Sequence, residues 1–160
     1  MKLILKQKIF SWFDSFNVYT EDRQIAFKVK GQLSWGKKLK IYTPRGDEIG
    51  AVHKQIISIT PSFDLYERGK KIVSINKKLF KLFGSAYKME SLVWTATGNF
   101  TEWNYKIKDS HGNQVAKIGK QLLNLTDTYV LDIHNPHDAL YVLMFVIAVD
   151  AEKSTRDDDD

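Results

Sequence analysis

The chain has 160 residues, of which 43% are hydrophobic, so it is long enough and apolar enough to bury the core of a globular domain. It contains no cysteine, which excludes disulfides and thiolate metal sites and removes any sign of an oxidising compartment. Its formal net charge of +5 is unevenly distributed: residues 1–149 carry 22 bases and 13 acids (+9), whereas residues 150–160 carry a net −4. We expect a basic body followed by an acidic, disordered tail, residues 154–160.

The first residues predict a strand and not a targeting segment. Lysine interrupts the apolar residues of 1–10 every few positions, so there is no unbroken signal-peptide core. The longest apolar run, 139–149, has eleven residues, fewer than the roughly 20 that a membrane-spanning helix needs. We therefore expect a cytoplasmic protein without a transmembrane segment.

Alternation of apolar and polar residues predicts short β-strands along most of the chain. The alternating residues 39–43 lead to a turn at Gly46 and a return strand at 48–52, which together predict a hairpin. Further strands are expected near 4–10, 16–20, 24–31, 62–67, 71–76, 86–99, 105–108, 114–118 and 128–133.

The first hairpin belongs to an internal repeat. When residues 40–65 are placed on 106–131 without a gap, seven of the 26 pairs are identical, Gly46 with Gly112 among them. We infer two halves, 3–67 and 73–133. Because no Pro/Gly/Ser-rich linker separates them, we expect both to share one core in a single domain, residues 1–153.

Residues 68–88 contain seven bases and no acid. Such an excess attracts polyanions, either phospholipid head groups or, less favoured because no base-stacking arrangement accompanies it, nucleic acid. The same lysines also suit a solvated face that keeps strand edges from pairing. Within this segment, 76–83 mixes lysine with leucine and phenylalanine, which fits either a membrane interface or a strand equivalent to 4–10. The candidate contacts to an anionic ligand are Lys70, Lys71, Lys77, Lys78 and Lys81.

The C-terminal part predicts a helix over 136–152. Asn135 and Pro136 suit the N-cap and first helical positions, and the charge of Asp138 suits the positive end of the helix. Residues 139–149 are apolar all round, so the helix must be enclosed on every side and the strands must wrap it. A central strand is the competing interpretation, because several of these residues are β-branched, but eleven residues would be long for a strand.

Several segments together resemble the LURP-one-related family of the tubby C-terminal-like superfamily. They are the opening residues 6–12 (KQKIFSW), the Lys-Gln pairs 54–55 and 120–121 after the glycine turns, residues 127–129 (DTY), and the apolar run that ends at Asp150. The resemblance implies a closed antiparallel barrel of about twelve strands around the C-terminal helix. Tubby domains and phospholipid scramblases act at membranes, and tubby domains bind phosphoinositides, so by analogy of fold the resemblance also implies a membrane role.

Catalytic motifs are missing from the sequence: there is no GxSxG, HExxH, phosphate loop or dinucleotide fingerprint, and His53 and His111 have no nucleophile beside them. Imidazole and carboxylate groups that are able to ligate a metal lie within seven residues, although this segment more simply turns the chain into the helix. These groups are Asp132, His134, His137 and Asp138. We expect no catalytic residue, metal or cofactor.

Three functions remain open on the sequence. The favoured one is a non-enzymatic barrel that binds an anionic ligand or phospholipid head groups through the basic segment. The alternatives are a protein-interaction scaffold, in which the lysines provide solubility, and an enzyme whose site is assembled from distant strands. Convergence of the lysines on one surface would favour a ligand, and their dispersal would favour solubility.

Overall fold

The computed structural model describes residues 1–6, 15–32, 37–57, 62–78, 86–89, 93–123 and 126–157, and at the ends of some elements only the backbone. Within these described residues, twelve antiparallel strands pair in chain order in one sheet. They are β1 (Lys2–Lys6), β2 (Ser15–Thr20), β3 (Ile25–Gln32), β4 (Lys38–Tyr42), β5 (Glu48–Lys54), β6 (Ser62–Glu67), β7 (Lys70–Lys78), β8 (Ala86–Met89), β9 (Trp94–Asn99), β10 (Asn104–Lys108), β11 (Gln114–Leu123) and β12 (Thr126–Ile133).

The last strand pairs with the first. Lys2 of β1 lies opposite Asp132 of β12, so the pairing continues around a ring and the strands form a closed barrel. Closure gives every strand a neighbour on both sides, which removes the exposed edges at which sheets aggregate. The expectation of a mostly β protein with one antiparallel sheet and one C-terminal helix is confirmed.

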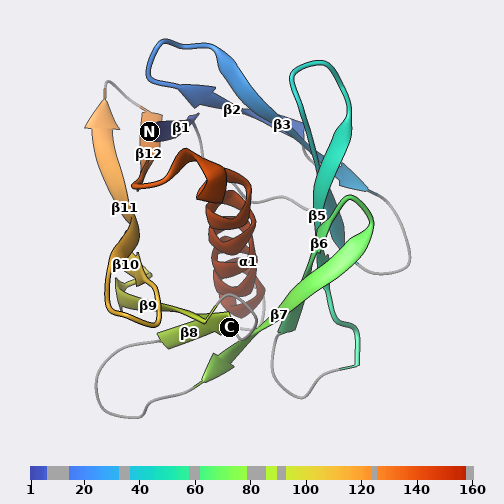
Figure 1. Cartoon of the computed structure of the whole chain (residues 1–160), viewed down its shortest axis with the longest axis vertical. Helices are drawn as coiled ribbons and strands as arrows, with labels where there is room; N and C mark the ends of the chain where they lie inside the picture. The colour runs from blue at the N-terminus through green and yellow to red at the C-terminus, as the bar shows by residue number, and fades with distance from the viewer. Residues whose placement is uncertain are drawn as a thin grey trace.

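A short 3-10 helix, η1 (Pro136–Asp138), leads into α1 (Ala139–Asp157), which runs through the middle of the barrel (Figure 1). The Asn135 side chain caps this start by accepting a hydrogen bond from the backbone N–H of His137 at 3.1 Å. Every residue from Val142 to Val149 is at most 1% exposed. The strands thus bury all faces of the apolar helix, as its sequence predicts.

The helix continues further than expected. α1 ends at Asp157, so the prediction of a disordered tail is wrong for residues 154–157, and residues 158–160 lie outside the described part of the chain. The physical reason lies in the charge pattern, because the like charges begin only at Asp157. The preceding residues carry opposite charges at Glu152 and Arg156, four residues apart, a spacing that favours helix.

The glycine turns of the two halves have the same geometry. Gly46 and Gly112 hold positive φ values of 101° and 82°. Each glycine N–H donates to the carbonyl oxygen three residues earlier, that of Thr43 at 3.0 Å and that of Asp109 at 3.1 Å. The structure therefore places the two glycines in equivalent turns, β4–β5 and β10–β11, as the 66-residue offset predicts.

Candidate functional site

The predicted lysines of the basic segment do not converge. Lys70 and Lys71 begin β7, whereas Lys77 and Lys78 end it, and a strand rises about 3.3 Å per residue, so the two pairs lie roughly 20 Å apart. Lys81 lies outside the described residues, as does the rest of 79–85. A set that is compact in sequence is thus divided between the two ends of the barrel.

Lys71 has an internal partner. Its Nζ lies 2.8 Å from Oδ1 of Asp64, which also accepts hydrogen bonds from Ser74 Oγ at 2.6 Å and Gln55 Nε2 at 2.8 Å. Burial alone would raise the pKa of Asp64, but the hydrogen bonds from Lys71, Ser74 and Gln55 outweigh it and hold the pKa below its ordinary value. Lys71 therefore helps to join β5, β6 and β7 and is not an open contact for an anion.

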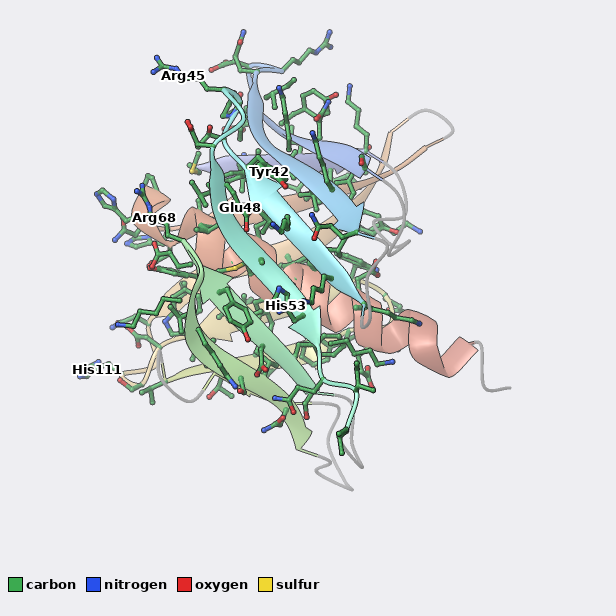
Figure 2. All side chains as sticks on the ribbon, turned by 90° about the vertical axis from the view of Figure 1, so that its right-hand side faces the viewer. Tyr42, Arg45, Glu48, His53, Arg68 and His111 are labelled. Carbon is green, nitrogen blue, oxygen red and sulfur yellow. The ribbon has the colours of Figure 1, made fainter. Side chains whose placement is uncertain are left out.

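The two ends of strands β4 to β7 differ in charge. Each end comprises the two strand residues nearest each connection and the described connecting residues. The end at which α1 finishes carries five lysines and no acid: Lys37, Lys38, Lys54, Lys77 and Lys78. The end at which α1 begins carries four bases, Arg45, Arg68, Lys70 and Lys71, and three acids, Asp47, Glu48 and Glu67. Figure 2 shows Arg45 and Arg68 in the turns of this mixed end and His53 further along β5.

Two exposed isoleucines lie among the five lysines. Ile56 and Ile57, in the β5–β6 connection, are 71% and 97% exposed. On either side of it, Lys37 precedes β4 and Lys78 is the last residue of β7. We call the set formed by Lys37, Lys38, Lys54, Ile56, Ile57, Lys77 and Lys78 the lysine–isoleucine edge.

Hydrogen bonds fix the residues from which the two isoleucines extend, Lys54 and Gln55 at the end of β5. The N–H of Gln55 donates to the carbonyl oxygen of Ser62 at 2.9 Å, closing the β5–β6 connection. The Gln55 side chain donates to Asp64, and the N–H of Lys54 donates to the carbonyl oxygen of Lys37 at 3.0 Å. The isoleucines therefore extend from a fixed base that also positions two of the lysines.

The charge at this edge also affects His53. Burial is the largest cause that lowers the pKa of His53, and the positive charge of Lys38 lowers it further. The imidazole packs on Tyr66 with ring centroids 4.3 Å apart. Both effects favour the neutral imidazole, which packs between strands β5 and β6 through its contact with Tyr66.

A groove of about 490 Å³ lies elsewhere on the barrel wall, over β11, β12 and β1 and beside the β9–β10 connection. Gly119 leaves open space there, with nothing within 4 Å of the position that a Cβ would take, whereas the equivalent position in the first half is occupied by His53. Its lining mixes amines and carboxylates, and Lys2 in it is already 3.1 Å from Glu21. The groove suits a polar ligand, but its lining concentrates neither positive nor negative charge.

Within the described ranges, no group of three or more His, Asp or Glu side chains is arranged to hold a metal ion. In segment 132–138, which the sequence offered as a metal site, the side chain of Asn135 accepts a hydrogen bond from the N–H of His137. Burial raises the pKa of Asp138 in the same segment. No helix of the described chain is long and apolar enough to cross a bilayer.

The sequence analysis missed the isoleucines and three of the lysines in the edge. Apolar pairs beside a strand normally belong to the core, so Ile56 and Ile57 gave no sign of their exposure. Lys37, Lys38 and Lys54 are dispersed in sequence, and only the pairing of β4, β5 and β6 brings them together. Of these three lysines, only Lys54 has a lysine at the equivalent position of the second half, Lys120, so the repeat does not mark the set.

Comparison with known proteins agrees with this architecture. The family model described as LURP-one-related matches residues 1–150. The chain belongs to the LURP-one-related family. It is 26% identical over 151 residues to the uncharacterised protein YxjI of Bacillus subtilis, a match that covers 94% of this chain and 92% of that protein. Its fold resembles the X-ray structure of a protein from Arabidopsis thaliana, with a TM-score of 0.60 and 9% identity over 91% of this chain and 89% of that one.

Proposed function

We propose that this protein is a non-enzymatic barrel that binds peripherally to membranes containing acidic phospholipids, with the lysine–isoleucine edge as its contact surface. The observation that carries the proposal is the gathering of five lysines at one end of strands β4 to β7, where the described strand ends and connections hold no acid. Each basic residue near an anionic bilayer contributes about 1 kcal/mol, so several lysines at one end of the barrel form an effective contact.

The fold supports the same proposal. A ring of twelve strands around a central helix agrees with the tubby C-terminal-like architecture that the sequence resembles, and members of that superfamily act at membranes. A cytoplasmic location with reversible attachment to the inner membrane surface fits a chain without cysteine and with a basic body.

Co-sedimentation with vesicles tests the proposal. The protein should pellet with vesicles made of equal parts of phosphatidylcholine and phosphatidylserine and remain in solution with phosphatidylcholine alone. Binding should weaken with added salt, because the Debye length falls to about 8 Å at physiological ionic strength. The triple variant Lys37→Glu/Lys38→Glu/Lys78→Glu should bind at least about 100-fold more weakly, since three contacts of about 1 kcal/mol are lost.

The opposite end of the same strands provides a matched control. Arg45→Glu/Arg68→Glu/Lys70→Glu changes the net charge by the same amount but at the end where acids are interspersed. This variant should retain most of the binding. Equal loss in both triple variants would mean that only the net charge matters, and no pelleting of the wild type with acidic vesicles at low salt would favour a protein-interaction scaffold instead.

A further inference from the structure

Ile56 and Ile57 form an exposed apolar tip at the end of the barrel. Large apolar side chains that are 71% and 97% exposed cost the folded protein part of the stability that burial would give. The hydrogen bonds of Gln55 to Ser62 and Asp64 fix the base of the tip, so the isoleucines are presented in a defined place.

The surroundings of the tip identify what would cover it. Lysines precede it at Lys54 and flank it at Lys37 and Lys78, and the ends of the neighbouring strands hold no acid in the described residues. An acidic lipid surface matches this arrangement, because its phosphates and carboxylates lie just outside a hydrocarbon layer. A soluble polyanion would match the lysines but not the isoleucines.

We infer that Ile56 and Ile57 insert into the acidic bilayer while the flanking lysines stay at its head groups, an inference that rests on the proposed membrane binding. The inserted residues make the contact specific for a bilayer, since a free phosphate or polyphosphate offers nothing apolar. They also give the barrel a defined orientation, with its axis directed toward the membrane at the end where α1 finishes.

Removal of the apolar tip separates the contribution of the inserted isoleucines from the electrostatic attraction of the lysines. Ile56→Ser/Ile57→Ser should weaken binding to vesicles of phosphatidylcholine and phosphatidylserine by about tenfold or more, because the transfer of two large apolar side chains is lost. The residual binding should be more sensitive to salt than that of the wild type. Binding to heparin, a soluble polyanion, should be unchanged, and so should the thermal unfolding, because both side chains are exposed.

Single labels locate the insertion directly. The chain contains no cysteine, so Ile57→Cys creates one attachment site for an environment-sensitive fluorophore. On acidic vesicles the label at 57 should report an apolar surrounding and be quenched by brominated lipid chains. Val93, 46% exposed in the β8–β9 connection at the other end, provides the control: a label on Val93→Cys should stay in water.

The outcomes distinguish this inference from the function on which it rests. If the serine variant binds acidic vesicles as tightly as the wild type and the label at 57 stays in water, insertion is overturned while electrostatic membrane binding stands. If the wild type does not bind acidic vesicles, the proposed function itself fails, and insertion fails with it.

Discussion

Asp64 shows how a single residue couples neighbouring strands. Its Oδ1 accepts hydrogen bonds from Lys71 and Ser74 of β7 and from Gln55, which follows β5. The carboxyl group is largely enclosed, with 14% of its side chain exposed, while its partner Lys71 is 48% exposed. The interaction is therefore partly screened by water, and its stabilisation lies near the low end of the range for charged hydrogen bonds.

Asp64→Asn should reduce both the stability and its dependence on pH. The pKa of Asp64 is lowered in the folded state, so its contribution is present above the ordinary carboxyl pKa and is lost as the pH falls through the lowered value. At neutral pH the variant should lose about 1 kcal/mol of unfolding free energy, because a neutral amide accepts these bonds less strongly. Urea unfolding across a pH series measures this, and the difference between the proteins should shrink in acid.

If the difference in unfolding free energy between the wild type and Asp64→Asn stayed constant down to strongly acidic pH, this account of Asp64 would be contradicted. Ser74→Ala serves as a partial control, since it removes one hydrogen bond of the cluster but leaves the carboxyl group. It should lower the stability by a smaller amount and keep most of the acid dependence.

At the scale of elements, α1 forms the core around which the strands close. Phe145, like its neighbours, is almost fully buried, at 1% exposure. Phe145→Asp would bury a carboxylate among apolar groups, one of the few changes that destabilise a protein severely. We expect loss of the soluble folded state, measured by circular dichroism and size-exclusion chromatography, whereas His111→Asp in an exposed turn should fold normally. A variant with aspartate at 145 that still unfolds cooperatively near the wild-type temperature would show that α1 is not essential to the core.

The elements also show which features a sequence can predict. The turns at Gly46 and Gly112 and the helix start at Asn135 were predictable because each depends on a local requirement, positive φ or an N-cap. The enclosure of α1 followed from its lack of a polar face. The exposure of Ile57 was not predictable, since it depends on how strands distant in sequence pair. The basic segment was misleading for a related reason, because an extended strand separates residues such as Lys70 and Lys78 that lie close in sequence.

At the scale of the whole molecule, charge is arranged along the barrel axis. α1 begins at the mixed end and, at about 1.5 Å per residue over its 19 residues, reaches the end that carries the lysine–isoleucine edge (Figure 1). α1 thus finishes at the basic end with Asp157, and three more aspartates, 158–160, follow it in the sequence. We expect this run of like charges to oppose the attraction of the lysines to an acidic bilayer, because nearby negative charge weakens the field of a basic surface.

Removal of residues 157–160 should therefore strengthen binding to vesicles of phosphatidylcholine and phosphatidylserine. The gain should be several-fold at low salt and small at physiological salt, because charges further apart than about 8 Å are then largely screened. Vesicle titration of the truncated chain and of the 160-residue chain measures it, with phosphatidylcholine vesicles as the neutral control. The thermal unfolding should be unchanged or slightly higher, since acids at the C-terminal end of a helix interact unfavourably with its dipole. Equal affinity of both chains for acidic vesicles at low salt would show that the tail charges do not act on the membrane-binding end.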